Sequence, residues 1–238
     1  MRISARGLRG RCLFLKDLLR YQRAKTPHKI PIASLYPVYR DRFGQAGSLG
    51  HYFHQDLWAA RKIFAARPVR HVDVGSRIDG FVAHCLTFMD VEVVDIRPMS
   101  HPPRGMTFRL ADAEQMTGFE DSSVTSLSSL NVAEHFGLGR YGDEVDPDAH
   151  VTFIKSLQRV LSPGGRLYFS VPVSGHERVE FNAHRVLSPT TVLKAFDRLK
   201  LVSFSCVNDD GCLSEDILPS AAASQRSGTG LFEFAKEA

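Results

Sequence analysis

Two short apolar runs carry the residues whose types and spacing could do chemistry. The first run, residues 69–74, contains Asp73 and is followed directly by Gly75. The second run, residues 91–96, contains Asp95, 20 residues after Gly75. A glycine turn after a strand lets the backbone approach a ligand closely, and an acid at the tip of the next strand accepts hydrogen bonds from ribose hydroxyls. This spacing predicts a nucleoside site on a parallel sheet.

Groups that could move a proton follow two later strands. His135 comes just after a predicted strand at 123–130, beside Glu134, in a loop rich in glycine. A histidine oriented by a carboxylate is a candidate general base. His184 lies between a predicted strand and the next helix and is a second candidate. The alternative interpretation is that His135 fixes its loop by hydrogen bonds and that His184 is a surface loop histidine.

Two other chemistries are not indicated. The chain has no His-x-His or His-Glu-x-x-His spacing, so the sequence predicts no metal site. It also has no Gly-x-Ser-x-Gly elbow, which would mark a hydrolase nucleophile.

The elements that must position these groups alternate from residue 69 onward. Strands are predicted at 69–74, 91–96, 106–110, 123–130, 166–171, 201–207 and 231–234. Helices are predicted at 51–66, 79–89, 147–161 and 189–199. We expect Asp79 and Asp146 to cap two of these helices and the Ser162–Gly165 turn to stop one. The alternation predicts an α/β fold, a mostly parallel sheet with helices on both faces, and the final two strands pair antiparallel at its edge.

The order of these motifs resembles the class I S-adenosylmethionine-dependent methyltransferases over about residues 69–238. Asp73-Val74-Gly75 resembles the opening of that family's glycine motif, and residues 161–167 resemble its turn before the fifth strand. Residues 51–58, 75–81 and 131–143 more closely resemble an uncharacterised methyltransferase-like family filed as a domain of unknown function. The resemblance implies a Rossmann-like fold and S-adenosylmethionine as the cofactor.

The resemblance also implies which residues contact the cofactor. Asp95 is the ribose acid, and Asp112-Ala113 is the position at the adenine edge. The other expected cofactor contacts are Asp73, Gly75, Ser76, Arg77, Asp79, Gly80, Ile96 and Asn131.

One departure from the family pattern concerns the glycine motif, acid-x-Gly-x-Gly-x-Gly. Arg77 and Asp79 stand at its second and third glycine positions. Arg77 could pair with the cofactor carboxylate, and Asp79 could accept hydrogen bonds from its ammonium. Alternatively, Asp79 only caps the helix, Arg77 points to water, and the two side chains partly close the cofactor pocket.

The activity implied by the resemblance is methyl transfer to a small-molecule or glycan acceptor, at oxygen, with His135 or His184 as base and Glu134 as orienting acid. The alternative is a non-catalytic protein of the same fold, in which Arg77 and Asp79 fill the pocket and the chain serves as a binding module. A nicotinamide enzyme is a third interpretation, which the absence of Gly-x-Gly-x-x-Gly argues against.

The charge of the chain is concentrated at its start. Residues 1–29 hold nine Lys/Arg against Asp17 alone, a charge of +8, so the remainder carries −4 of the formal +4 total. The main domain therefore gives no indication of nucleic-acid binding. Residues 8–25 place Leu8, Cys12, Leu15 and Leu19 at helical spacing. This basic amphipathic helix could contact an anionic membrane or a protein partner, or pack on the main domain.

We expect two parts: a basic helix and connector at 1–50, and the methyltransferase-like domain at 51–238. The composition, 43% apolar and 24% charged, is typical of globular proteins. Four cysteines without Cys-x-x-Cys spacing suit a reducing cytoplasm. No run of 18 apolar residues and no signal-peptide pattern is present, so a cytoplasmic location is predicted, and the oligomeric state stays open.

Overall fold

The computed structural model describes residues 5–25, 28, 30–44, 46–47 and 49–238. The chain divides into two compact units, Met1–Ser48 and Leu49–Ala238, which are described separately. Within the described residues, no helix combines the length and the apolar character needed to cross a bilayer.

The first unit is built on helix α1, Ala5–Arg23. One face of α1 is covered by the segment 30–43, where Phe14 packs edge-on against Tyr39 at 5.7 Å between ring centroids and Asp17 pairs with Arg42 at 2.6 Å. Short 3-10 turns at Ile32–Ser34 and Asp41–Phe43 shape that segment. Of the side chains predicted to form the apolar stripe of the helix, Leu8, Leu15 and Leu19 are 55–59% exposed, and Cys12 is exposed as well.

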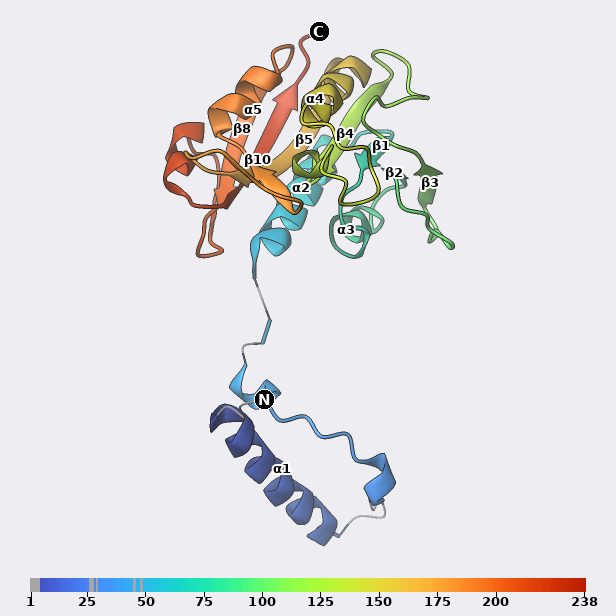
Figure 1. Ribbon diagram of the computed structural model, residues 1–238. Helices are drawn as coiled ribbons and strands as arrows, with labels where there is room; N and C mark the ends of the chain where they lie inside the picture. The colour runs from blue at the N-terminus through green and yellow to red at the C-terminus, as the bar shows by residue number, and fades with distance from the viewer. Residues whose placement is uncertain (1–4, 26–27, 29, 45, 48) are drawn as a thin grey trace. The chain divides into compact units, whose positions relative to one another are not determined.

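The second unit contains one eight-stranded sheet with the strand order β3-β2-β1-β4-β5-β10-β8-β9 (Figure 1). Its strands are β1 His71–Val74, β2 Val91–Asp95, β3 Met106–Leu110, β4 Val124–Leu130, β5 Leu161–Val173, β8 Lys200–Val207, β9 Leu213–Ser214 and β10 Gly228–Ala235. The first five are parallel to one another, and β10 is antiparallel to both β5 and β8. The predicted α/β fold, with a mostly parallel sheet and a final antiparallel pair, is confirmed.

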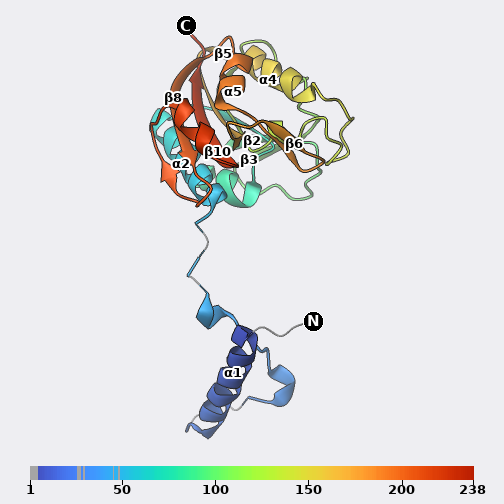
Figure 2. The same cartoon turned by 60° about the vertical axis from the view of Figure 1, so that its left-hand side comes forward.

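Helices cover both faces of this sheet, as the alternation predicted. Helix α2, His51–Ala66, and helix α3, Ala83–Cys85, bury Trp58, Ile63 and Cys85 on one face. Helix α4, Ala149–Val160, and helix α5, Pro189–Ala195, lie on the other face, where Phe153 and Leu157 are fully buried. In Figure 2, α2 and α5 lie on opposite sides of β8 and β10.

Within the predicted antiparallel pair, the last strand, β10, is the inner one, and only the two-residue strand β9 lies beyond its partner β8. β10 lies between β5 and β8, and β8 continues to the short strand β9. The inner residues of β10 explain its position, because Leu231, Phe232 and Phe234 are each no more than 1% exposed and pack into both cores. A strand buried on both faces belongs inside a sheet.

Three local predictions also need correction. The turn after Gly75 continues as a π-helical turn, Ile78–Val82, before α3, and Asp79 makes no side-chain cap because its carboxylate pairs with Arg77. Helix α4 begins at Ala149, since Asp146 accepts from the backbone N–H of Asp148 in a turn before the helix. The turn predicted at 162–165 is a bulged start of β5.

A hairpin of β6, Arg178–Glu180, and β7, His184–Val186, was not predicted from the sequence. It lies in the connection between β5 and α5, so it projects from the carboxyl end of β5. His184, predicted in a loop, is on β7 opposite Glu180.

Candidate functional site

A cavity of about 680 Å³ opens at the carboxyl ends of β1, β2 and β4. Side chains of α2, of the loops after these strands, of the hairpin and of the start of β10 line it. The residues predicted from the sequence that line it are Gly75, Ser76, Arg77, Asp79, Asp95, Asn131, Glu134, His135 and His184. Ligands bind open α/β sheets at this position, outside the carboxyl ends of the strands.

A smaller cavity of about 80 Å³ adjoins the first and shares Gly75, Asp95 and Asn131 with it. Apolar side chains from the ends of β1 and β2 and from the following loops form most of its walls. The lining includes the predicted residues Ile96, Asp112 and Ala113, together with Val74, Val94, Val132 and Phe136. An apolar slot with a few acids at its rim suits a flat, partly polar ring.

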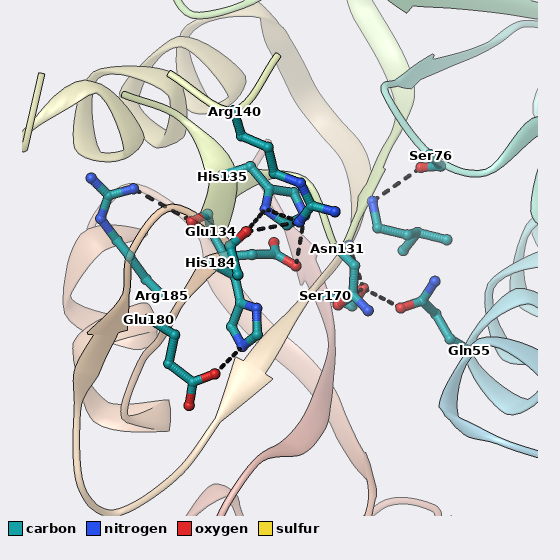
Figure 3. A network of polar contacts seen from close by, with 12 residues as sticks. Gln55, Ser76, Asn131, Glu134, His135, Arg140, Ser170, Glu180, His184 and Arg185 are labelled. Carbon is teal, nitrogen blue, oxygen red and sulfur yellow. Dashed lines mark hydrogen bonds and ion pairs between the residues drawn. The ribbon is translucent and has the colours of Figure 1, made fainter. Parts of the chain in front are cut away.

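The glycine turn is held by buried polar groups beneath it. Asp73 is fully buried and accepts hydrogen bonds from Ser76 Oγ at 2.6 Å and Ser128 Oγ at 2.5 Å. Ser76 Oγ in turn accepts from the backbone N–H of Leu130 at 3.0 Å (Figure 3). Burial raises the pKa of Asp73 to about 6. Asp73 lines neither cavity, so it positions the turn and is not in reach of a ligand there.

Gly75 needs to be glycine for two reasons. Its φ is +68°, in the left-handed region that side chains disfavour. A Cβ at this position would also lie 2.9 Å from Val132 Cγ1. The backbone therefore runs close to the loop that follows β4, where both cavities meet.

Arg77 and Asp79 pair with each other at the wall of the larger cavity. The guanidinium donates to the Asp79 carboxylate at 3.1 Å and stacks 4.7 Å from the ring centre of Tyr52. The two charges compensate, and the cavity stays open beside them. Gly80, also predicted to contact the cofactor, lines neither cavity; a Cβ there would lie 2.1 Å from Asp56 Oδ2, so the residue allows the turn to pack on α2.

Asp95 already has an ionic partner, Arg97, which the sequence analysis did not foresee. Oδ1 accepts from the Arg97 backbone N–H and from Nε, and Oδ2 accepts from Nη2 at 2.6 Å. A carboxylate offers about four acceptor positions, so one position remains on Oδ2. The Asp95 side chain is only 6% exposed, yet it lines both cavities. It can therefore accept one further hydrogen bond from a ligand hydroxyl.

Asn131 ends β4 in the left-handed region, with φ +55°. Ser170 Oγ lies 3.3 Å from Asn131 Oδ1 and 2.8 Å from Gln55 Oε1, so β4, β5 and α2 meet here (Figure 3). This contact fixes the loop that carries the candidate bases.

Glu134 and His135 lie side by side in that loop, with Glu134 Oε1 3.8 Å from His135 Nε2. The Glu134 side chain is 2% exposed, and its Oε2 has no hydrogen-bond partner among the described residues. Loss of hydration raises the pKa of Glu134 to about 8. A buried polar atom without a partner, in a residue that lines a cavity, calls for an explanation.

His135 is oriented by the carbonyl of Ala183, which lies 2.7 Å from Nδ1. Arg140 donates to the same carbonyl at 2.8 Å, so Nδ1 carries the proton and Nε2 faces Glu134 (Figure 3). Burial lowers the pKa of His135 to about 4 despite this hydrogen bond. The interaction with a loop carbonyl is the one considered as an alternative in the sequence analysis.

His184 reaches the cavity from the hairpin, with Nε2 3.4 Å from Glu180 Oε2. The structure thus brings all three predicted catalytic residues to one cavity. It adds Arg97, Arg140 and Tyr141, and the Asp95-x-Arg97 spacing was the one available signal for Arg97. Among residues whose placement is described, no three His, Cys, Asp or Glu side chains are grouped to hold a metal ion.

Residues 111–209 match a family described as "Caenorhabditis protein of unknown function, DUF268". The match covers less than half of the chain and agrees with the resemblance to a family of unknown function. No curated protein matches the sequence significantly.

Solved structures give a likeness over the whole second unit. The N-methyltransferase NodS from Bradyrhizobium japonicum, bound to S-adenosylhomocysteine, is 14% identical, with 93% of this chain and 97% of that chain covered and a TM-score of 0.51. A Burkholderia thailandensis 1,6-didemethyltoxoflavin-N1-methyltransferase, also with S-adenosylhomocysteine, is 16% identical over 100% and 93% of the chains, with a TM-score of 0.52. The [4+2]-cyclase SpnF is 12% identical over 100% and 98%, with a TM-score of 0.53.

These likenesses establish that the chain has the class I methyltransferase fold, which confirms the predicted resemblance at that level. SpnF is named as a cyclase, so the fold alone does not specify the reaction.

Proposed function

We propose that this protein binds S-adenosylmethionine in the two adjoining cavities and methylates an oxygen of a small-molecule or glycan acceptor. The observation that carries the proposal is Asp95, whose free acceptor position lies where both cavities meet, beside the glycine turn. The structures with S-adenosylhomocysteine bound to the same fold support this choice of cofactor.

The residues present fit this cofactor. Asp95 would accept from a ribose hydroxyl, and the slot formed by Ile96, Ala113 and Phe136 would take the adenine, with Asp112 at its amino edge. The larger cavity would take the methionine half beside Gly75. Because Arg77 and Asp79 lie together on its wall, their opposite charges match the carboxylate and the ammonium of an amino acid.

S-adenosylmethionine supplies a methyl group on a positively charged sulfur that leaves as a neutral thioether. The protein has to align the acceptor and remove its proton. Asn131 and Gln55 hold the loop that carries Glu134 and His135, the candidate bases, and His184 faces the same space. Tyr52 and Tyr141 line the cavity and would exclude water from the bound acceptor.

Titration calorimetry with S-adenosylhomocysteine tests the proposal. We expect the wild-type chain to bind it, and Asp95→Asn to bind roughly 10- to 150-fold more weakly, since a hydrogen bond to a charged group is worth about 1.5–3 kcal/mol. Asp121→Asn, an exposed acid that lines neither cavity, serves as the matched control. Absence of binding to the wild type at millimolar ligand would remove the cofactor and the enzyme together.

A non-catalytic binding role is the second candidate, and the first unit favours it. Its helix α1 leaves three leucines exposed among basic side chains, which suits an anionic membrane or protein surface. This role does not exclude catalysis, because the cavities belong to the second unit.

A further inference from the structure

The reaction proposed above leaves open which group takes the acceptor's proton. Resting on that proposed function, we propose that Glu134 Oε2 receives it, and that His135 is a positioning residue which keeps the Glu134 side chain in place. His184 then has no part in the proton transfer.

The first observation is the environment of Glu134. Its side chain comes from the short turn Ala133–His135 directly after β4, and Glu134 is one of the residues that line the larger cavity. Its Oε2 is buried and has no hydrogen bond to the described residues. The charged and titratable groups around it are Tyr52 of α2, His135 of the same turn, Arg140 of the following loop, and Arg185 of β7. Arg185 donates to the backbone carbonyl of Glu134, and none of the four hydrogen-bonds the carboxyl.

A buried carboxyl oxygen without a partner is costly unless a ligand satisfies it. A hydroxyl or amine hydrogen of the acceptor would do so, because a carboxylate only accepts hydrogen bonds. Since burial raises the pKa of Glu134 to about 8, its ionised form is a much stronger base than an ordinary carboxylate.

The second observation concerns His135, the more familiar kind of base. Its Nδ1 donates to Ala183, and Arg140 lies 3.4 Å from the same nitrogen and shares that carbonyl. A second proton on the ring would place its charge next to the Arg140 guanidinium inside a largely buried site. The low pKa of His135, about 4, follows from this burial and makes the ring a poor proton acceptor.

His184 is held in a different way. Its Nε2 faces Glu180 across the β6–β7 hairpin, and Glu180 is itself engaged by Arg178 at 2.8 Å. The ring therefore belongs to a cluster of polar contacts within the β6–β7 hairpin, with Glu180 as its partner.

The acceptor oxygen forms a bond to the methyl carbon and loses its hydrogen to Glu134 Oε2. The carbon–sulfur bond breaks, and its electron pair stays on the sulfur. Glu134 ends protonated and neutral, and it returns its proton to water when the product leaves.

The test follows the titration of individual side chains by NMR on the full chain, with 13C-labelled carboxyl groups and 15N-labelled imidazoles, in the presence of S-adenosylhomocysteine. We expect one carboxyl to titrate near pH 8, to disappear from the spectrum of Glu134→Gln, and to persist in His135→Gln. The His135 ring should stay neutral between pH 5 and 9.

Two results would overturn the inference. One is a Glu134 carboxyl that titrates near its ordinary value of about 4.5. The other is a His135 ring that titrates near neutrality, which would make histidine the base. The dissociation constant of Glu134→Gln for S-adenosylhomocysteine should stay within about threefold of the wild-type value. The reason is that Glu134 is proposed to contact the methyl acceptor and not the cofactor. If the wild type fails to bind that ligand, the proposed function falls and this inference falls with it. If it binds the ligand but no Glu134 carboxyl titrates near pH 8, the inference alone falls.

Discussion

Two neighbouring residues, Glu134 and His135, respond to the same burial in opposite directions. Loss of hydration raises the pKa of the acid to about 8 and lowers that of the base to about 4, because each group favours its uncharged form. Between these values both side chains are predominantly neutral. Two pairs of opposite charges, Arg77 with Asp79 and Arg97 with Asp95, also line the cavity. Arg140 lines it as well and donates to the carbonyl of Ala183, so no carboxylate among the described residues pairs with its charge.

The first prediction at this scale concerns Gly75. Gly75→Ala should destabilise the fold by about 1–2 kcal/mol for the left-handed backbone and by about 1–3 kcal/mol more for the contact with Val132. Gly164→Ala is the matched control, because Gly164 has a φ of +74° and nothing within 4 Å of an added Cβ. Chemical denaturation measures both variants. Equal losses of unfolding free energy would show that the approach to Val132 carries no cost.

Residues of the candidate site could be predicted from the sequence where the path of the backbone fixes their position. Gly75 and Asp95 could be placed, since a glycine turn and a strand tip have fixed relations in a parallel sheet. The hydrogen-bond and ion-pair partners of the side chains could not be predicted from the sequence in this way. The Arg97–Asp95 pair and the neutral state of Glu134 depend on burial and on segments far apart in the chain, which spacing does not report. Asp73 and Gly80 matched a cofactor motif but serve the packing of the turn.

At the scale of elements, strands β1 and β4 share a buried histidine. His71 lies between Ser126 Oγ at 2.8 Å and Ser128 Oγ at 3.0 Å and is fully buried. Burial lowers its pKa to about 3. A neutral ring can donate to one hydroxyl and accept from the other, so His71 joins the two strands without a charge.

This arrangement predicts a dependence of stability on pH. Between pH 6.5 and about 3 the unfolded chain binds a proton at His71 that the folded chain does not, so the unfolding free energy falls as the pH falls. The contribution reaches about 1.4 kcal/mol per pH unit. Denaturation at pH 7, 6 and 5 should show a shallower decline for His71→Gln than for the exposed-site control His101→Gln. Parallel declines in the two variants would contradict the assignment.

Burial also explains which helices and strands could be predicted from the sequence. Apolar period and length located every strand of the large sheet except the two-residue β9, because these strands are buried. The π-helical turn at Ile78–Val82 could not be foreseen, since it depends on the close approach of Gly80 to Asp56 of α2. The β6–β7 hairpin is short, polar and exposed at Val179, so it carries no hydrophobic signal.

At the scale of the whole molecule, the exposed leucines of α1 make a testable surface. Leu15→Glu combined with Leu19→Glu should weaken co-sedimentation of the full chain with anionic vesicles by at least about tenfold, because each leucine contributes roughly 1.5–3 kcal/mol when buried. Leu218→Glu, at a 75% exposed leucine in the second unit, is the control. Vesicle binding that is unchanged in the double variant would exclude the leucine stripe as the contact.

The central position of β10 has a consequence for how the protein is made. Residues 228–235 provide the hydrogen bonds that join β5 to β8, and they leave the ribosome after every other strand. Until then, the nascent chain holds two incomplete half-sheets with open edges, which are prone to pair with other chains. We expect native assembly of the sheet to wait until residues 228–235 have been synthesised, and a premature stop codon before residue 228 to yield an aggregating product.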